Sequence, residues 1–165
     1  MFSKRVCQVL HDEHLATIRL VERLGALLDR CRHAPPDGAD GPVAQLLRDI
    51  PPAMESEVTR HFDFEEAHLF NYLAEIGDAA IGAHLTEEHE AMRPLGRKLA
   101  TLARAAAASG FDARGWQAFQ SVAHELCDRL LGHVQKEEMV LLPLLEENLD
   151  PAADASLHEA YTVNA

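Results

Sequence analysis

Two short stretches of the sequence share a histidine that is followed, four residues later, by a glutamate. They are "HFDFEE" at 61–66 and "HVQKEE" at 133–138. A histidine and a glutamate with this spacing project from one face of an α-helix. Imidazole nitrogens and carboxylate oxygens together are donors that suit iron, manganese or zinc. The repeated pattern therefore indicates a metal site built from two helices.

Both pairs lie on the apolar stripe of their own helix rather than on its polar side. In the segment 51–75 the stripe steps by four and three residues through Met54, Val58, His61, Glu65, His68 and Tyr72. In the segment 113–148 it steps through Leu126, Leu130, His133, Glu137, Val140 and Leu144. Such a stripe faces the interior of a helical bundle. A buried carboxylate without a partner is costly, so two of them call for a compensating cation.

Stretches rich in Pro, Gly and Asp divide the chain into four long helical segments, at about 4–32, 51–75, 80–108 and 113–148. The prolines of "DIPPA" (49–53) are placed as at the start of a helix, and a short helical piece is expected at 43–49. Another short helix is expected in the tail after 154. We predict an all-α, up-down-up-down four-helix bundle, in one domain over 1–165 with its core at about 5–148 and a tail at 149–165.

The two halves of the chain resemble each other. "DEH" at 12–14 matches "EEH" at 87–89, and the stretch from His61 matches the stretch from His133. The helix pairs should therefore be related by a pseudo-two-fold axis, with one histidine from each helix and one glutamate from each of the second and fourth. The predicted metal ligands are His14, His61, Glu65, His89, His133 and Glu137. This symmetric set suits two ions, with the glutamates placed to bridge them.

Other polar residues near these stripes have more than one interpretation. His11, one turn before His14, is either a histidine at the rim or a further ligand or hydrogen-bonding neighbour. His68 is placed to line a pocket, and Tyr72 either packs in the core or donates to a bound group. His84 would reach the site only through a π-bulge. Glu66 and Glu138 are turned away from Glu65 and Glu137, toward solvent or toward a hydrogen bond with a ligand.

Composition limits the classes of function. The net charge is −12, so a nucleic-acid partner is not expected, because phosphate binding needs a basic surface. Hydrophobic residues make up 47% of the chain and aromatic residues only 5%, which favours helices over strands. The 3 cysteines are widely spaced and form no CxxC pair. We expect no signal peptide, no membrane span and a cytoplasmic location.

These motifs resemble the hemerythrin superfamily, specifically the cation-binding HHE domains, over about 5–148. The resemblance implies a non-haem centre of two iron ions with an oxo, hydroxo or water bridge. It also implies chemistry with dioxygen, peroxide or nitric oxide, in stress response, iron handling or the repair of iron centres. The oxygen-carrying members have HxxxH in helix three and HxxxxD in helix four. Here Leu85 precedes His89 by four residues, and helix four carries HxxxE. The four-histidine, two-glutamate set is closer to the iron–sulfur repair proteins of the superfamily.

The sequence is also compatible with two alternatives. The bundle could bind or store zinc, manganese or another divalent cation without redox chemistry, because ligand types do not fix the metal. It could also be a helical module that docks a partner. No acid–base pair or nucleophile stands apart from the predicted metal ligands, so the sequence leaves open whether the protein is an enzyme. It also leaves open whether the chain is a monomer or a homo-oligomer.

Overall fold

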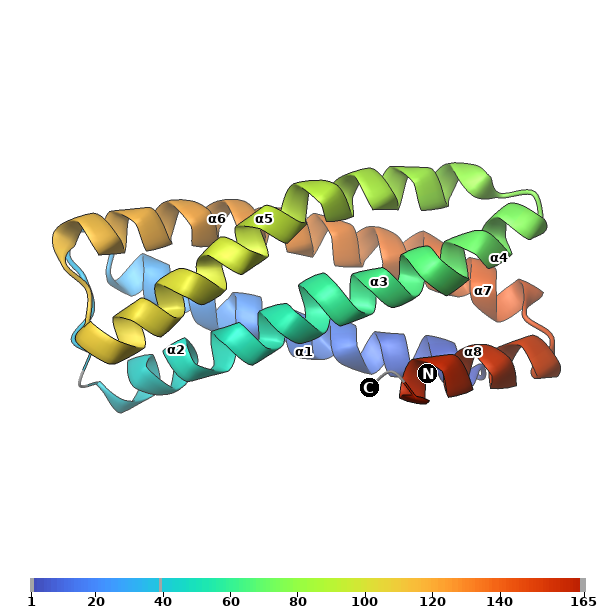
Figure 1. The fold of residues 1–165 in the computed structure, drawn as a ribbon, viewed down its shortest axis with the longest axis horizontal. Coiled ribbons are helices and arrows are strands. Elements are labelled where there is room, and N and C mark those ends of the chain that lie inside the picture. The colour runs from blue at the N-terminus through green and yellow to red at the C-terminus, as the bar shows by residue number, and fades with distance from the viewer. Residues whose placement is uncertain (1, 39, 164–165) are drawn as a thin grey trace.

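The computed structural model describes residues 2–38 and 40–163, and within these ranges it contains helices and no strand. Four long helical rods run alternately up and down, as predicted (Figure 1). A further helix, α8 (Pro151–Val163), lies outside the four rods. None of the helices in the described ranges combines the length and apolar character needed to cross a membrane. The first rod is α1 (Arg5–Arg30); the second is α2 (Gly41–Met54), η1 (Glu55–His61), α3 (Phe62–Phe64), η2 (Glu65–Leu69) and α4 (Phe70–Glu75); the third is α5 (Ala79–Ser109); the fourth is α6 (Ala113–Lys136), η3 (Glu137–Leu141) and α7 (Leu142–Asn148); α8 spans Pro151–Val163.

The second rod begins earlier than predicted. Pro51 and Pro52 lie inside α2, which starts at Gly41, so the expectation that a helix starts at these prolines was wrong. Proline lacks an N–H donor, but its fixed φ is close to the helical value. The backbone N–H of Glu55 donates to the carbonyls of Pro51 and Pro52, so the chain stays helical through the pair. The short helix expected at 43–49 is therefore the first part of the second rod.

Three segments in the second and fourth rods, η1, η2 and η3, are π-helical. π-Turns are rare and occur often at functional sites. His61 is the last residue of η1, Glu65 is the first of η2, and Glu137 is the first of η3. From η2 and η3 onward the inward face of the rod is shifted by one residue relative to α-helical spacing. Val140, predicted to face inward, is 49% exposed, while Leu141 is fully buried, so the predicted inward position of Val140 was wrong.

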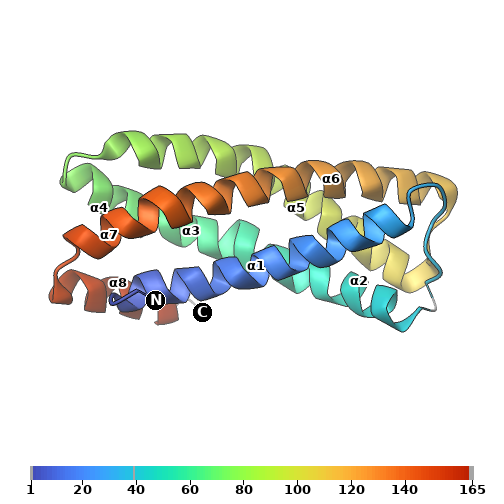
Figure 2. The ribbon, with the colours of Figure 1, turned by 180° about the vertical axis from the view of Figure 1, so that it is seen from behind.

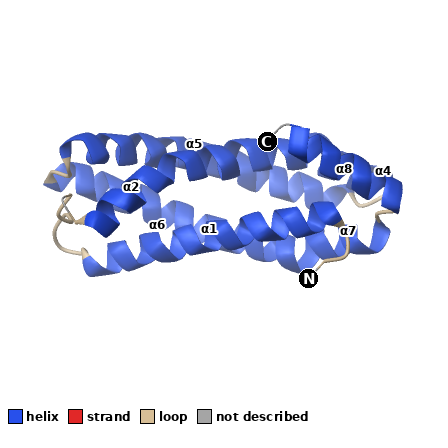
Figure 3. Cartoon of the chain, turned by 90° about the horizontal axis from the view of Figure 1, so that it is seen from below, coloured by secondary structure: helices blue, strands red, loops and turns tan. Residues whose placement is uncertain are grey.

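The apolar core is divided into two clusters. One contains Val58, Phe62 and Leu130, and extends through α2 and the facing ends of α1, α5 and α6. The other contains Leu10 and Leu141, together with residues of α4, α7 and α8. Within the bundle α1 contacts α2 and α6, and α5 contacts α2, α4 and α6 (Figures 2 and 3). The predicted metal ligands lie along the rods between these two clusters.

Close contact between the second and third rods depends on a glycine. A Cβ atom added at Gly96 of α5 would lie 2.9 Å from a methyl group of Val58 in η1. We expect Gly96→Ala to lower the free energy of unfolding by about 1–3 kcal/mol, because extra volume in a packed interface forces strain. Gly132 of α6 has open space around its Cβ position, so Gly132→Ala should stabilise by about 0.5–1 kcal/mol. Urea denaturation of both variants measures the two free energies of unfolding. Equal changes in the two variants would contradict the predicted close contact at Gly96.

Candidate metal centre

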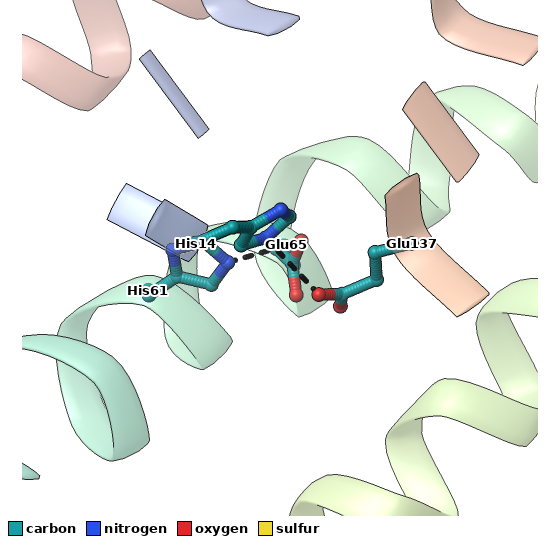
Figure 4. Close-up of side chains that lie close together, drawn as sticks. All are labelled: His14, His61, Glu65 and Glu137. Carbon is teal, nitrogen blue, oxygen red and sulfur yellow. Dashed lines mark ion pairs between the residues drawn. The ribbon is translucent and has the colours of Figure 1, made fainter. Parts of the chain in front are cut away.

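The six predicted ligands come together in two groups that share both glutamates. One group is His14, His61, Glu65 and Glu137, shown in Figure 4. The other is Glu65, His89, His133 and Glu137. In each group the candidate donor atoms lie within 4.8 Å of one another. All six residues are buried, with exposed fractions of 0 or 1%. These are two buried groups that could hold metal ions.

Each glutamate turns one oxygen toward each histidine pair. Glu65 Oε1 lies 3.4 Å from His61 Nε2, and Glu65 Oε2 lies 3.4 Å from His89 Nε2. Glu137 Oε2 lies 3.1 Å from His14 Nε2, and its Oε1 lies 2.8 Å from His133 Nε2. A carboxylate in this position can bind two ions, one through each oxygen. The arrangement follows the pseudo-two-fold repeat of the helix pairs.

A second carboxylate fixes the orientation of each histidine through the other ring nitrogen, Nδ1. An acceptor at Nδ1 fixes the tautomer that leaves the Nε2 lone pair free for a metal. Glu13 and Glu88 were not identified from the sequence, although each directly precedes a candidate histidine. Of the two alternatives predicted for Glu66 and Glu138, the structure shows the hydrogen bond to a candidate ligand: Glu66 contacts His89 and Glu138 contacts His14. The four contacts are His14 Nδ1 to Glu138 (2.6 Å), His61 Nδ1 to Glu13 (2.9 Å), His89 Nδ1 to Glu66 (2.8 Å) and His133 Nδ1 to Glu88 (2.9 Å).

Without a cation, the histidines act as the positive partners of the buried carboxylates. Burial alone would lower the pKa of His14, but Glu137 and Glu138 outweigh it and raise this pKa to about 9. For His133, burial is likewise outweighed, mainly by Glu137, and the pKa rises to about 9. Burial would raise the pKa of Glu137, but His133 and His14 hold it well below its ordinary value. The centre therefore holds protons that a cation would displace.

Unpaired polar atoms show that the donors fit a cation. Both carboxylate oxygens of Glu65 and of Glu137 lack a hydrogen-bond partner within the described residues, as does Nε2 of His14 and of His61. Nearly all buried polar atoms in proteins have a partner, so a group of orphans at one point requires an explanation. Nε2 of His89 also lies 3.0 Å from Nε2 of His133. Four nitrogens and four carboxylate oxygens converging in this way match the donors preferred by iron, manganese or zinc.

The other candidates lie outside the two groups. His11 contacts Glu138 at 2.9 Å, and so touches the carboxylate that orients His14. His68 lines a surface cleft beside Phe64. The Tyr72 hydroxyl donates to the carbonyl of Asn148 at 2.8 Å, and His84 is largely exposed and lies 3.4 Å from Glu88. Once the π-turn of η2 has shifted the register, Leu69 and Leu73 are buried instead of His68 and Tyr72.

The fold and the site define an all-α bundle in which each rod contributes a histidine, and two of the rods a glutamate, to a buried centre that could hold metal ions. The chain belongs to the Hemerythrin HHE cation binding domain family, whose model matches residues 6–145. A second match to the same model covers residues 83–162 and begins within α5, in keeping with the similarity of the two helix pairs. A search of curated proteins found no match.

Proposed function

We propose that this chain holds a carboxylate-bridged pair of iron ions that binds or reacts with dioxygen, peroxide or nitric oxide. In this proposal His14 and His61 hold one ion, and His89 and His133 hold the other. Glu65 and Glu137 bridge the two. The observation that carries the proposal is that each glutamate directs one oxygen to each histidine pair. The match to the cation-binding family supports the same assignment.

Iron bound here would supply one-electron redox chemistry and affinity for small oxygen- or nitrogen-containing ligands. The residues of the chain bind, orient and shield. The outer carboxylates hold each imidazole with Nε2 directed inward, and their negative charge raises the basicity of the ring. Phe62 is fully buried and stacks on His89, with ring centroids 3.8 Å apart, so that ring cannot swing away. The two apolar clusters on either side limit access of water.

A redox-silent site for zinc or another divalent cation uses the same donors, so measurement of the metal decides between them. We expect the purified native protein to contain about two irons per chain, one for each histidine pair. Its absorption in the near-ultraviolet and visible should change when dithionite reduces the protein under anaerobic conditions. Nitric oxide or peroxide added to the reduced and oxidised forms should then alter the spectrum. A colourless protein that contains zinc would contradict the iron chemistry, and one that cannot bind metal would contradict the centre itself.

A further inference from the structure

One of the four outer carboxylates is held by a helix outside the bundle. Glu66 and Glu88 contact cationic side chains of the rods themselves, Arg93 and Lys136, and Glu138 contacts His11 of α1. Glu13 also has such a contact, with Arg60 at 2.7 Å. In addition, the hydroxyl of Tyr161 in α8 donates to Glu13 Oε2, the oxygen that also contacts His61 Nδ1. The two histidine pairs therefore have different surroundings.

Helix α8 is attached to α1 at two points. The carboxylate of Asp154 accepts hydrogen bonds from the backbone N–H groups of Arg5 and Val6, both at 3.1 Å, in the first turn of α1. Tyr161, two turns later in α8, reaches Glu13, two turns later in α1. The two helices thus run parallel, side by side (Figures 1 and 2). Docking of α8 consequently places the tyrosine hydroxyl at a fixed point on α1.

Tyr161 is itself held firmly. Its side chain is 4% exposed, its ring meets the ring of Phe64 edge-on at 4.6 Å, and the Arg60 guanidinium lies 5.0 Å from its centroid. Burial and the neighbouring Glu13 raise the pKa of the hydroxyl, so it remains a hydrogen-bond donor. Glu13, by contrast, is partly exposed, with 24% of its side chain accessible. Water would compete for its oxygens if the tyrosine did not occupy one of them.

We propose that Tyr161 is a positioning residue for one of the two metal positions, acting through Glu13 on His61. This inference rests on the proposed dinuclear centre. His61 belongs to the group that contains His14, and Glu13 touches neither His89 nor His133 in the contacts described above. Helix α8 therefore makes the position at His14 and His61 dependent on its own docking, while the position at His89 and His133 is supported from within the bundle.

Release of cobalt tests this inference. Protein loaded with Co²⁺ is mixed with an excess of the chelator 4-(2-pyridylazo)resorcinol, and the coloured chelate is followed over time. Loss of a carboxylate that hydrogen-bonds a metal-binding histidine typically costs 10- to 100-fold in metal affinity. Tyr161 contacts such a carboxylate, Glu13, and not the histidine itself, so we expect a smaller effect. We expect Tyr161→Phe to accelerate release of one of the two cobalt equivalents by roughly 3- to 10-fold and to leave the other unchanged. The substitution keeps the ring that packs on Phe64 and Arg60.

Two further variants separate positioning from general stability. Tyr72→Phe removes a hydroxyl whose hydrogen bond to the Asn148 carbonyl lies at the surface, away from the two groups of donors. This variant should release both cobalt equivalents at wild-type rates. In a Glu13→Ala background, Tyr161→Phe should have no additional effect, because the influence passes through Glu13. Wild-type rates in Tyr161→Phe, or equal acceleration of both equivalents, would overturn the inference. Wild-type protein that takes up no cobalt would contradict the dinuclear centre, and this inference with it.

Discussion

Replacing Glu65 by Met is expected to empty both metal positions, while His61→Ala should leave about one ion in place, at His89 and His133. Glu65 belongs to both groups of donors, and each of its oxygens faces a different histidine pair. His61 belongs to one group. The loss of affinity at each position in Glu65→Met should exceed the roughly 10- to 100-fold cost of losing an outer partner, because a direct donor is removed. Metal per chain after loading and desalting is the measurement.

The same variant should remain folded. Glu65 is fully buried, and neither of its oxygens has a hydrogen-bond partner in the described structure. Replacement of a buried charge by an apolar side chain of similar volume is often neutral or stabilising, by about 1–4 kcal/mol. The metal-free Glu65→Met protein should therefore unfold at a urea concentration no lower than that of the metal-free wild type.

Glu75→Ala, an exposed position on the same rod, provides the control and should retain both ions. If Glu65→Met retained one ion, or if His61→Ala retained both, the shared bridging arrangement would be wrong. A Glu65→Met protein that unfolds would instead mean that the Glu65 carboxylate stabilises the metal-free fold. The comparison with His61→Ala keeps these explanations apart.

The sequence predicts the helical bundle, and in the second and fourth rods it predicts the inward face as far as Glu65 and Glu137. It does so because the apolar residues recur with helical periodicity. Steps of four and three residues correctly place Val58, His61, Leu130 and His133 in the interior. Beyond Glu65 and Glu137 the prediction slips by one residue, because each glutamate begins a π-turn. A π-turn depends on local hydrogen bonding rather than on a residue pattern, so a stripe drawn with α-helical spacing continues to Val140, whereas the protein buries Leu141.

The outer carboxylates show a second limit of sequence reasoning. Glu66 and Glu138 could be proposed as neighbours of the site because each follows a candidate ligand. Glu13 and Glu88 act across the bundle, on histidines that are distant in sequence. The only local signal is that each precedes a histidine in a repeated "EH" pair. The contact of Tyr161 with Glu13 has no local signal, because it depends on how α8 docks against α1.

Metal binding by this chain should strengthen as the pH rises from about 6.5 to 9, because protons occupy the site when metal is absent. The pKa values of His14 and His133 are raised to about 9 in the folded, metal-free protein. A metal binds the neutral imidazole, so each ion must displace at least one proton. Apparent affinity should therefore rise about tenfold per pH unit for each proton displaced within this window. Above pH 9 the dependence should flatten.

Stability of the metal-free protein should show the opposite trend. A histidine whose folded pKa exceeds its unfolded value of about 6.5 contributes stability that is complete below pH 6.5. That contribution is lost as the pH rises through about 9. The lowered pKa of Glu137 contributes in the other direction: its stabilising effect is present above the ordinary carboxyl range and is lost on acidification. The metal-free protein should thus unfold most readily at strongly acidic pH and above pH 9.

Calorimetric titration with Co²⁺ at pH 7.5, in two buffers of different ionisation enthalpy, counts the protons released. We expect at least two protons for two ions, because His14 and His133 both have raised pKa values and the pKa of His61 is raised as well. His133→Ala should release about one proton fewer, because it lacks one of these histidines. Urea denaturation of the metal-free protein between pH 6 and 10 tests the predicted loss of stability as the pH rises through about 9. Cobalt affinity that is independent of pH, with no proton release, would mean that the histidines are already neutral near pH 7. The pairing with Glu137 that raises the pKa values of His14 and His133 would then not exist in the metal-free protein.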